Sequence, residues 1–327
     1  MTTYNPKVSI VIPAYKAANY LAEAIDSALA QTYDNIEVIV VNDGSPDDGA
    51  TEAVAHAYGS KIIYVAKENG GSSSALNEGI RRMTGEWFSW LSHDDLYYPN
   101  KVQEEIDAIH RLLKNGLPQD QLYKHLFFGT ADLIDAHGRV IRKEKNKTIQ
   151  ATDRKINCAS GTLNLVAIPT QDGFHGCSCL VHRDAFAEVG LFDESLRLLN
   201  DMDLWFRFYT SGYTVHFVPK VLVCGRVHAS QVSRSIGFSY HNAEQDMFWN
   251  RSLNWLKENH PHNYDVFYLF GKTALLKTRY VEGRAAFRVA AALRPSESAE
   301  LFLRQGVYML FSAAKECAKK IYLRVCS

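Results

Sequence analysis

The chain has 327 residues, of which 46% are hydrophobic and 22% charged, an ordinary globular balance that argues against long disordered tracts. Thirty-six basic and 36 acidic residues leave a formal net charge of zero, so no global field attracts a nucleic-acid backbone, and we expect no nucleic-acid partner. This length allows one large α/β domain with an appendage, or two domains.

Cysteines and the N-terminus bear on the cellular compartment. The six cysteines lack the paired spacing of a zinc site or a disulfide scaffold, which favours free thiols in a reducing compartment. Residues 1–7 contain no apolar signal core, and no apolar run reaches the ~18–20 residues of a membrane span. We therefore expect a cytoplasmic protein.

The N-terminal part alternates between apolar runs and helical periodicity. Strands are expected at residues 8–12, 36–41, 61–65 and 87–91, and helices at 17–32, 51–58 and 75–83. Continuous β-branched runs are typical of strands that are covered on both faces of a parallel sheet. The alternation predicts parallel strands with right-handed crossovers, so the residues that follow each strand should share one edge of the sheet.

The middle of the chain predicts further mixed structure. Helices are expected at residues 101–114, 183–189 and 200–211, strands at 122–129 and 215–227, and a hairpin within 132–142. Residues 143–163 are polar and are either a mobile loop over a site or a plain surface excursion.

From about residue 239 the pattern becomes helix after helix. Tyr264–Pro295 has the spacing of a single tetratricopeptide-like repeat, which favours a helical appendage over a repeat array. Leu303–Val325 has one apolar and one basic face, which suits the inner face of a membrane or packing on a domain or a second subunit. We expect a domain at 1–238, with a nucleotide-binding half at 1–100 and an acceptor half at 101–238, and an all-helical region at 239–327.

Four short polar signals occur in a fixed order. They are Pro13-Ala14-Tyr15, Asn42-Asp43-Gly44-Ser45, Ser92-His93-Asp94-Asp95 and Asn200-Asp201-Met202-Asp203. Carboxylates at the carboxyl ends of neighbouring strands converge on the crevice where open α/β sheets bind ligands. Their order and spacing predict an enzyme with a nucleotide-type site.

With the apolar runs before them, these signals resemble the family 2 glycosyltransferases of the GT-A fold, and the resemblance covers roughly residues 6–235. It implies a Rossmann-like, mostly parallel sheet flanked by helices. It also implies a metal-assisted, inverting transfer of one sugar from a nucleotide-diphosphate sugar, with UDP as the expected nucleotide, to a hydroxyl of a glycan or lipid-linked acceptor. Mn²⁺ or Mg²⁺ is the implied cofactor.

The resemblance also implies roles for single residues. Nucleotide contacts are expected from Pro13, Ala14, Tyr15, Asp43, Gly71, Ser92 and His93. Asp94 is the expected metal ligand, and His228 a further ligand or phosphate donor. Asp201 is the expected base for the acceptor hydroxyl. Acceptor or diphosphate contacts are expected from His175, Trp205 and Arg226.

Three departures from the family pattern stand out, and ordinary roles stay open beside the functional ones. Ser92 replaces a frequent aspartate, and Asn200 replaces a frequent glutamate but keeps hydrogen-bonding capacity. Leu76 replaces a frequent arginine, which puts a cationic donor contact from that helix in doubt. Asp43 can simply close a turn, Asp201 can cap a helix, and aromatic residues beside such motifs are often core. Asp203 is expected to be the structural partner of a nearby arginine or backbone group.

Two rival functions remain open. A sugar-nucleotide-forming nucleotidyltransferase shares the layered α/β plan, but the segment after the first strand, Pro13–Ala17, lacks the expected glycine. A non-catalytic nucleotide-sugar binding module would explain Ser92 as decay of a metal site.

Overall fold

The computed structural model describes residues 4–144, 175–231 and 238–325. The chain divides into two compact units, Met1–Ala159 with Asp172–Ile236, and Ser160–Gln171 with Gly237–Ser327. Most of the segment 143–163, for which an excursion or a loop was expected, lies outside the described residues. The domain boundary expected at residue 238 stays a prediction.

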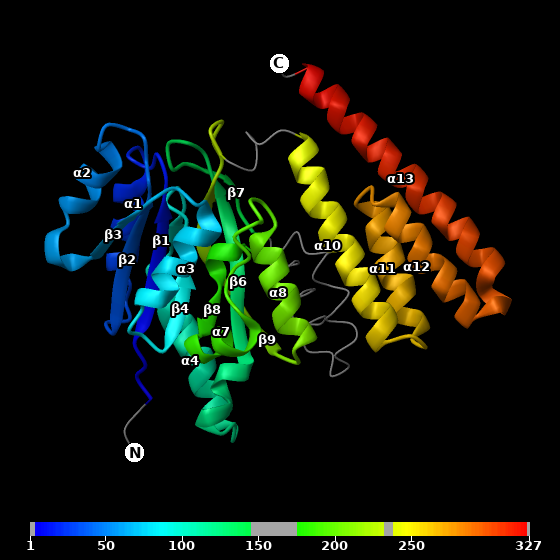
Figure 1. Ribbon diagram of the computed structural model, residues 1–327, viewed down its shortest axis with the longest axis horizontal. Coiled ribbons are helices and arrows are strands. Elements are labelled where there is room, and N and C mark those ends of the chain that lie inside the picture. Colours follow the sequence, from blue (N-terminus) through cyan, green and yellow to red (C-terminus); the bar gives the residue numbers. More distant parts are fainter. Residues whose placement is uncertain (1–3, 145–174, 232–237, 326–327) are drawn as a thin grey trace. The chain divides into compact units, whose positions relative to one another are not determined.

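One sheet forms the centre of the first unit (Figure 1). Its strands lie in the spatial order β3-β2-β1-β4-β8-β6-β9-β5, and β7 pairs with β6. Within the described residues the strands are β1 Val8–Ala14, β2 Ile36–Asp43, β3 Ile63–Lys67, β4 Trp87–Trp90, β5 Leu96–Tyr97, β6 His125–Ile134, β7 Val140–Arg142, β8 Leu180–His182 and β9 Thr214–Arg226. β1 runs parallel to β2 and β4, and β2 runs parallel to β3, so the carboxyl ends of these strands share one edge, as predicted.

The other half of the sheet is mixed. β6 is parallel to β9, whereas β8 is antiparallel to both β4 and β6. The hairpin expected within residues 132–142 is formed by β6 and β7. The strand expected from residue 122 begins three residues later, because Gln119–Lys124 form a 3₁₀ turn.

Helices cover both faces of the sheet. Their bounds in this unit are α1 Leu21–Leu29, α2 Ala50–His56, α3 Ser72–Arg82, α4 Lys101–Lys114, α7 Arg183–Val189 and α8 Asn200–Thr210. Val8, Ile10 and Ile12 of β1 are buried in one core with residues of α1 and α4. On the opposite face, α3 approaches so closely that a Cβ at Gly79 would lie 2.2 Å from Val11 Cγ1. Burial on both sides explains why the strand reads as one apolar run.

The described residues of the second unit are helical, as expected. Their helices are α10 Phe238–Asn259, α11 Tyr264–Leu276, α12 Tyr280–Leu293 and α13 Ser298–Val325. α11 and α12 pack through small residues, since a Cβ at Gly271 would lie 3.1 Å from the carbonyl oxygen of Gly283. None of the described helices has both the length and the apolar composition to cross a bilayer.

The N-terminal half of α13 carries an exposed apolar row. The row consists of Phe302, Leu303, Val307, Leu310 and Phe311, each about half exposed or more. Arg304 in this half is already paired with Glu300 of the same helix. The basic side chains expected further along the helix, from Lys315 onward, lie outside the described side chains.

Candidate active site

Asp43 ends β2 and organises the loop that follows β3. Its carboxylate accepts hydrogen bonds from the amides of Gly70 at 2.9 Å and Gly71 at 2.7 Å, and Lys67 Nζ donates from 2.8 Å. The next residue, Gly44, has φ +64, a conformation that suits glycine. The turn after β2 is closed by Asn42, whose Oδ1 accepts the amide hydrogen of Ser45 at 3.1 Å, whereas Asp43 holds the loop after β3. The contact of Asp43 with a nucleoside stays a prediction.

The loop that ends β1 lies beside the Asp43 loop. Pro13 and Ala14 are buried at the end of the strand, whereas Tyr15 is 39% exposed. The amide of Lys16 donates to Ser45 Oγ at 3.0 Å, which joins the two loops. Two of the predicted nucleotide segments are therefore neighbours, and Tyr15 offers an accessible ring beside them.

A cation that the sequence analysis missed lies at the start of α3. Gly71 precedes the helix with φ +88, and a Cβ there would lie 2.0 Å from Arg197 Nη1. Asn200, at the start of α8, donates from its side-chain amide to Ser73 Oγ at 3.1 Å, which holds the starts of the two helices together. The cationic group that Leu76 lacks is thus supplied to this loop from a distant segment. Arg197 lies just before the Asn200-Asp201 signal, which is the one clue in the sequence.

Asp94 and His228 meet at the carboxyl end of the sheet. His228 Nε2 lies 2.9 Å from Asp94 Oδ2, and His228 Nδ1 lies 2.9 Å from Ser230 Oγ. The ring of Tyr20 packs on the imidazole, with the ring centres 4.9 Å apart. The two residues predicted as metal ligands are therefore brought together, with the imidazole oriented by its second nitrogen. His93 lies in the same turn between β4 and β5.

The structure contradicts the expected role of Arg226 as a contact to the diphosphate. It is 2% exposed, and its Nε donates to the carbonyl of Asp94 at 2.7 Å while Nη2 pairs with Glu23 at 2.7 Å. Nη1 donates to the carbonyl of Ala136 at 3.2 Å. All three guanidinium nitrogens are thus engaged inside the protein, so Arg226 supports the Asp94 loop rather than facing a diphosphate.

Asp201 lies in the first turn of α8 and is half-buried. Its Oδ1 accepts the amide hydrogen of Met202 at 2.7 Å. Burial raises the pKa of this carboxyl, and that hydrogen bond and the charge of His175 lower it only in part. A Cβ at Gly176 would lie 3.3 Å from Asp201 Oδ2, so the glycine leaves space beside the oxygen. A carboxylate with raised proton affinity suits a general base.

Trp205 lies four residues further along α8. Its position contradicts the expected contact with the acceptor. The indole is 7% exposed and packs edge-on against Phe128, with ring centres 4.9 Å apart, and against Phe192. It belongs to the aromatic core under α8. Asp203 pairs with Arg207 at 2.8 Å, which confirms its expected structural role.

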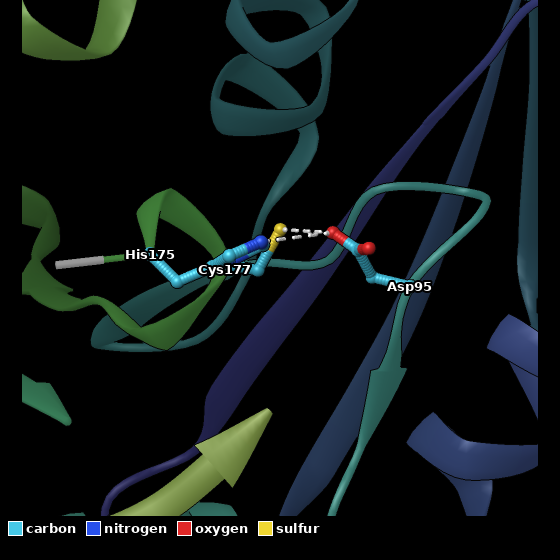
Figure 2. A group of neighbouring side chains, drawn as sticks. All are labelled: Asp95, His175 and Cys177. Carbon is cyan, nitrogen blue, oxygen red and sulfur yellow. Dashed lines mark hydrogen bonds and ion pairs between the residues drawn. The ribbon is translucent and has the colours of Figure 1, made fainter. Parts of the chain in front are cut away.

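Asp95, His175 and Cys177 form a cluster beside the Asp94 loop (Figure 2). Asp95 Oδ1 accepts the amide hydrogen of Arg226 at 2.8 Å, and Oδ2 lies 3.3 Å from Cys177 Sγ and 3.7 Å from His175 Nε2. Burial and the charge of Asp94 raise the pKa of Asp95, and burial raises the pKa of the Cys177 thiol. The sequence analysis treated Cys177 as an ordinary thiol, although it lies two residues after His175.

Comparisons with known proteins decide the family. The model of the family described as "Glycosyl transferase family 2" matches residues 9–117 of this chain. An uncharacterised glycosyltransferase of Rickettsia prowazekii is 43% identical over 233 residues, which are 71% of this chain and 67% of that protein. The chain belongs to glycosyltransferase family 2. A second relative, an uncharacterised glycosyltransferase of Rickettsia bellii, is 45% identical over 259 residues, or 79% of this chain. This chain spans only 35% of that longer relative.

Among solved structures, the crystal structure of residues 1–349 of TarS from S. aureus in complex with UDP-GlcNAc matches with a TM-score of 0.61. The match covers 96% of this chain and 92% of that one, at 13% sequence identity. At this identity the likeness concerns the fold alone. The expected family and the α/β fold with a C-terminal helical region are therefore confirmed.

Proposed function

We propose that this family 2 glycosyltransferase moves a single sugar from a nucleotide-diphosphate sugar to a hydroxyl of a glycan or lipid-linked acceptor, with inversion at the anomeric carbon. The observation that carries the proposal is the contact between Asp94 and His228 at the same sheet edge as the Asp43 loop. UDP is the proposed nucleotide, supported by the structural likeness to a protein crystallised with UDP-GlcNAc.

Asp94 and His228 fit a divalent cation such as Mn²⁺ or Mg²⁺. One carboxylate oxygen and one imidazole nitrogen, 2.9 Å apart, are close enough to bind the same ion. They leave its other positions to phosphate oxygens and water, which suits hard cations. When bound, the ion would neutralise charge on the diphosphate leaving group. Arg226 keeps the backbone of Asp94 in place for this contact.

Asp201 is the proposed general base. Because the displacement inverts the anomeric centre, the acceptor hydroxyl attacks from the side opposite the diphosphate and must lose its proton as it does so. Asp201 Oδ1 is held by the amide of Met202, whereas Oδ2 faces the space kept open by Gly176. His175, whose charge acts on Asp201, is the remaining candidate for the acceptor side.

The nucleotide is proposed to lie across the loops of β1, β2 and β4. Tyr15 offers a ring face to the base, and Asp43 offers its remaining lone pairs to the base or the ribose. The amide-rich start of α3 suits the phosphates. Arg197 adds a positive charge at the start of this helix, whose own arginines, Arg81 and Arg82, lie in the last turn. Ser92 and His93 complete the predicted nucleotide contacts.

Calorimetry with UDP, with and without Mn²⁺, tests the proposal. Affinity for UDP that increases with Mn²⁺, together with sugar transfer in the presence of acceptor, supports it. UDP binding that is indifferent to metal and without transfer would favour a non-catalytic binding module. Release of pyrophosphate from a nucleoside triphosphate and a sugar phosphate would favour a nucleotidyltransferase.

For the helical unit we propose self-association of two copies of this chain through the exposed row on α13. Apolar rows of this size are seldom left in contact with water. Arg304, the cation within the described part of the row, is paired with Glu300 of its own helix. Peripheral membrane binding at the cytoplasmic face is the alternative outcome of the test below.

A further inference from the structure

We propose that Asp95, His175 and Cys177 form a second cation site, for a thiophilic divalent ion such as Zn²⁺, separate from the Asp94 and His228 pair. One ligand atom from each residue lies within 4.8 Å of the other two. Figure 2 shows the carboxylate of Asp95 pointing toward the sulfur and the imidazole, which come from the opposite side.

Two of the three spacings between the ligand atoms already suit one ion, and the third is within 4.8 Å. Zinc bonds of ~2.0–2.3 Å in a tetrahedral arrangement separate the ligand atoms by roughly 3.3–3.8 Å. Asp95 Oδ2 lies 3.3 Å from Cys177 Sγ and 3.7 Å from His175 Nε2. Only small adjustments of side chains are needed to bring all three to bonding distance.

The backbone around the cluster is fixed before any ion binds. The amide of Arg226 holds Asp95 Oδ1, so Oδ2 is left for the ion. The hydroxyl of Ser178, next to Cys177, lies 2.7 Å from the carbonyl oxygen of His175 and 2.9 Å from that of Gly129, and it can donate to either. A Cβ at Gly225 would lie 2.9 Å from His175 Nε2, so this glycine keeps the binding nitrogen clear. These contacts give the site a formed scaffold.

A fourth ligand is at hand. Ser92 Oγ lies 3.2 Å from Cys177 Sγ, at the position where the family often has aspartate. His175, at 29% side-chain exposure, places one side of the cluster next to solvent. Ser92 or water would complete four-coordination.

The chemistry of the donor set separates this site from its neighbour. A thiolate with an imidazole and a carboxylate favours Zn²⁺ over Mg²⁺, whereas Asp94 and His228 contain no sulfur. On binding, the Cys177 thiol releases its proton to solvent and a metal–sulfur bond replaces its hydrogen bond to Asp95. A bound ion would add positive charge beside Asp94 and Asp201, so we expect it to inhibit transfer. This last expectation, unlike the site itself, rests on the proposed function.

Titration of the metal-free full chain with Co²⁺ tests the site without any assay of activity. The wild type should develop a thiolate-to-Co²⁺ charge-transfer band in the near ultraviolet, which Zn²⁺ removes and Mg²⁺ does not. Cys177→Ser should abolish the band, and His175→Gln should weaken Co²⁺ affinity by about tenfold or more. Cys224→Ser and Asp94→Asn are the matched controls, and both should keep the band.

Two outcomes would overturn the site: a folded wild type that shows no band, and a band that survives Cys177→Ser. Circular dichroism checks that each variant is folded. If Cys177→Ser does not fold, the less buried His175→Gln decides, because unchanged Co²⁺ affinity in that variant also removes the site. Asp94→Asn removes a ligand of the Asp94 and His228 pair but none of this cluster. The proposed function and the second cation site can therefore fail independently.

Discussion

The imidazole of His228 lies 2.9 Å from the carboxylate of Asp94, although 134 positions separate the two residues in the chain. Neither is positioned by itself. Ser230 Oγ contacts the second nitrogen of the imidazole, and Arg226 holds the carbonyl of Asp94. Because these contacts hold both residues within the protein itself, the pair is already arranged without a bound donor.

Loss of either partner should remove the metal-linked part of UDP binding. We expect Asp94→Asn and His228→Gln each to lower the gain in UDP affinity on adding Mn²⁺ by about tenfold or more, since each removes a ligand. Calorimetry with and without Mn²⁺ measures the gain. His56→Gln, on the exposed surface of α2, is the matched control and should behave as the wild type. An undiminished gain in both variants would contradict the metal assignment.

Substitutions of two aspartates in the first turn of α8 should have different effects, one on the rate of transfer and the other on the free energy of unfolding. Asp201→Asn should lower kcat by roughly 10²–10⁴-fold, the usual contribution of a general base, and leave donor affinity and Tm nearly unchanged. Asp203→Asn removes a buried partner of Arg207 and should lower stability by about 1–3 kcal/mol. Single-turnover kinetics and thermal melts distinguish the two effects. Wild-type kcat in Asp201→Asn would exclude this residue as the base.

The rate of transfer should fall in acid through the titration of Asp201. Burial raises the pKa of this carboxyl, and only its deprotonated form accepts the proton of the acceptor. The acid limb of the kcat profile should therefore have its midpoint above the usual value for aspartate, with activity lost as the pH falls through it. The residual activity of Asp201→Asn should lack this limb. A limb of unchanged position in that variant would assign it to another group.

Two glycines with positive φ should differ in their effect on nucleotide binding. Gly71→Ala places a Cβ 2.0 Å from Arg197 Nη1, whereas a Cβ at Gly49, with φ +79, meets nothing within 4 Å. Each substitution should cost about 1 kcal/mol or more from the backbone conformation alone. Only Gly71→Ala should also weaken UDP binding, because Arg197 must move. Equal UDP affinity in the two variants would remove Arg197 from the donor site.

The apolar row on α13 should hold two copies of the chain together. Sedimentation velocity of the wild type should show a dimer at micromolar concentration, and Leu303→Glu with Leu310→Glu should shift it to monomer. Lys257→Glu, at an exposed position of α10, changes the net charge by the same two units and serves as the control for added negative charge. A monomeric wild type that co-sediments with anionic vesicles would instead assign the row to a membrane.

The first half of the fold follows from local pattern because each buried strand is a continuous apolar run. The two-residue strand β5 was not predicted, since its pairing with β9 is non-local and it is too short to show periodicity. β3 begins two residues later than expected, which is the usual uncertainty at an element boundary. Local pattern therefore predicts which long elements exist better than where they end.

Motifs that follow strands were correctly expected to meet at one edge of the sheet, as Asp94 and His228 do, whereas the direction of single side chains was not. Trp205 and Arg226 lie beside motifs, but the helix and strand that carry them point them into the core, which spacing alone does not reveal. Cys177 was missed because its partner Asp95 lies 82 positions away. Arg197 was missed for the same reason, since its neighbour Gly71 belongs to another loop.

The guanidinium of Arg226 joins three stretches of chain that are remote in sequence, through Glu23 on α1, the carbonyl of Asp94 and the carbonyl of Ala136. The position of the Asp94 loop therefore depends on a side chain that solvent does not reach. Glu23 itself is about half exposed. A substitution at this outer position would thus act on the Asp94 loop through Arg226, although Glu23 lies in none of the four polar signals.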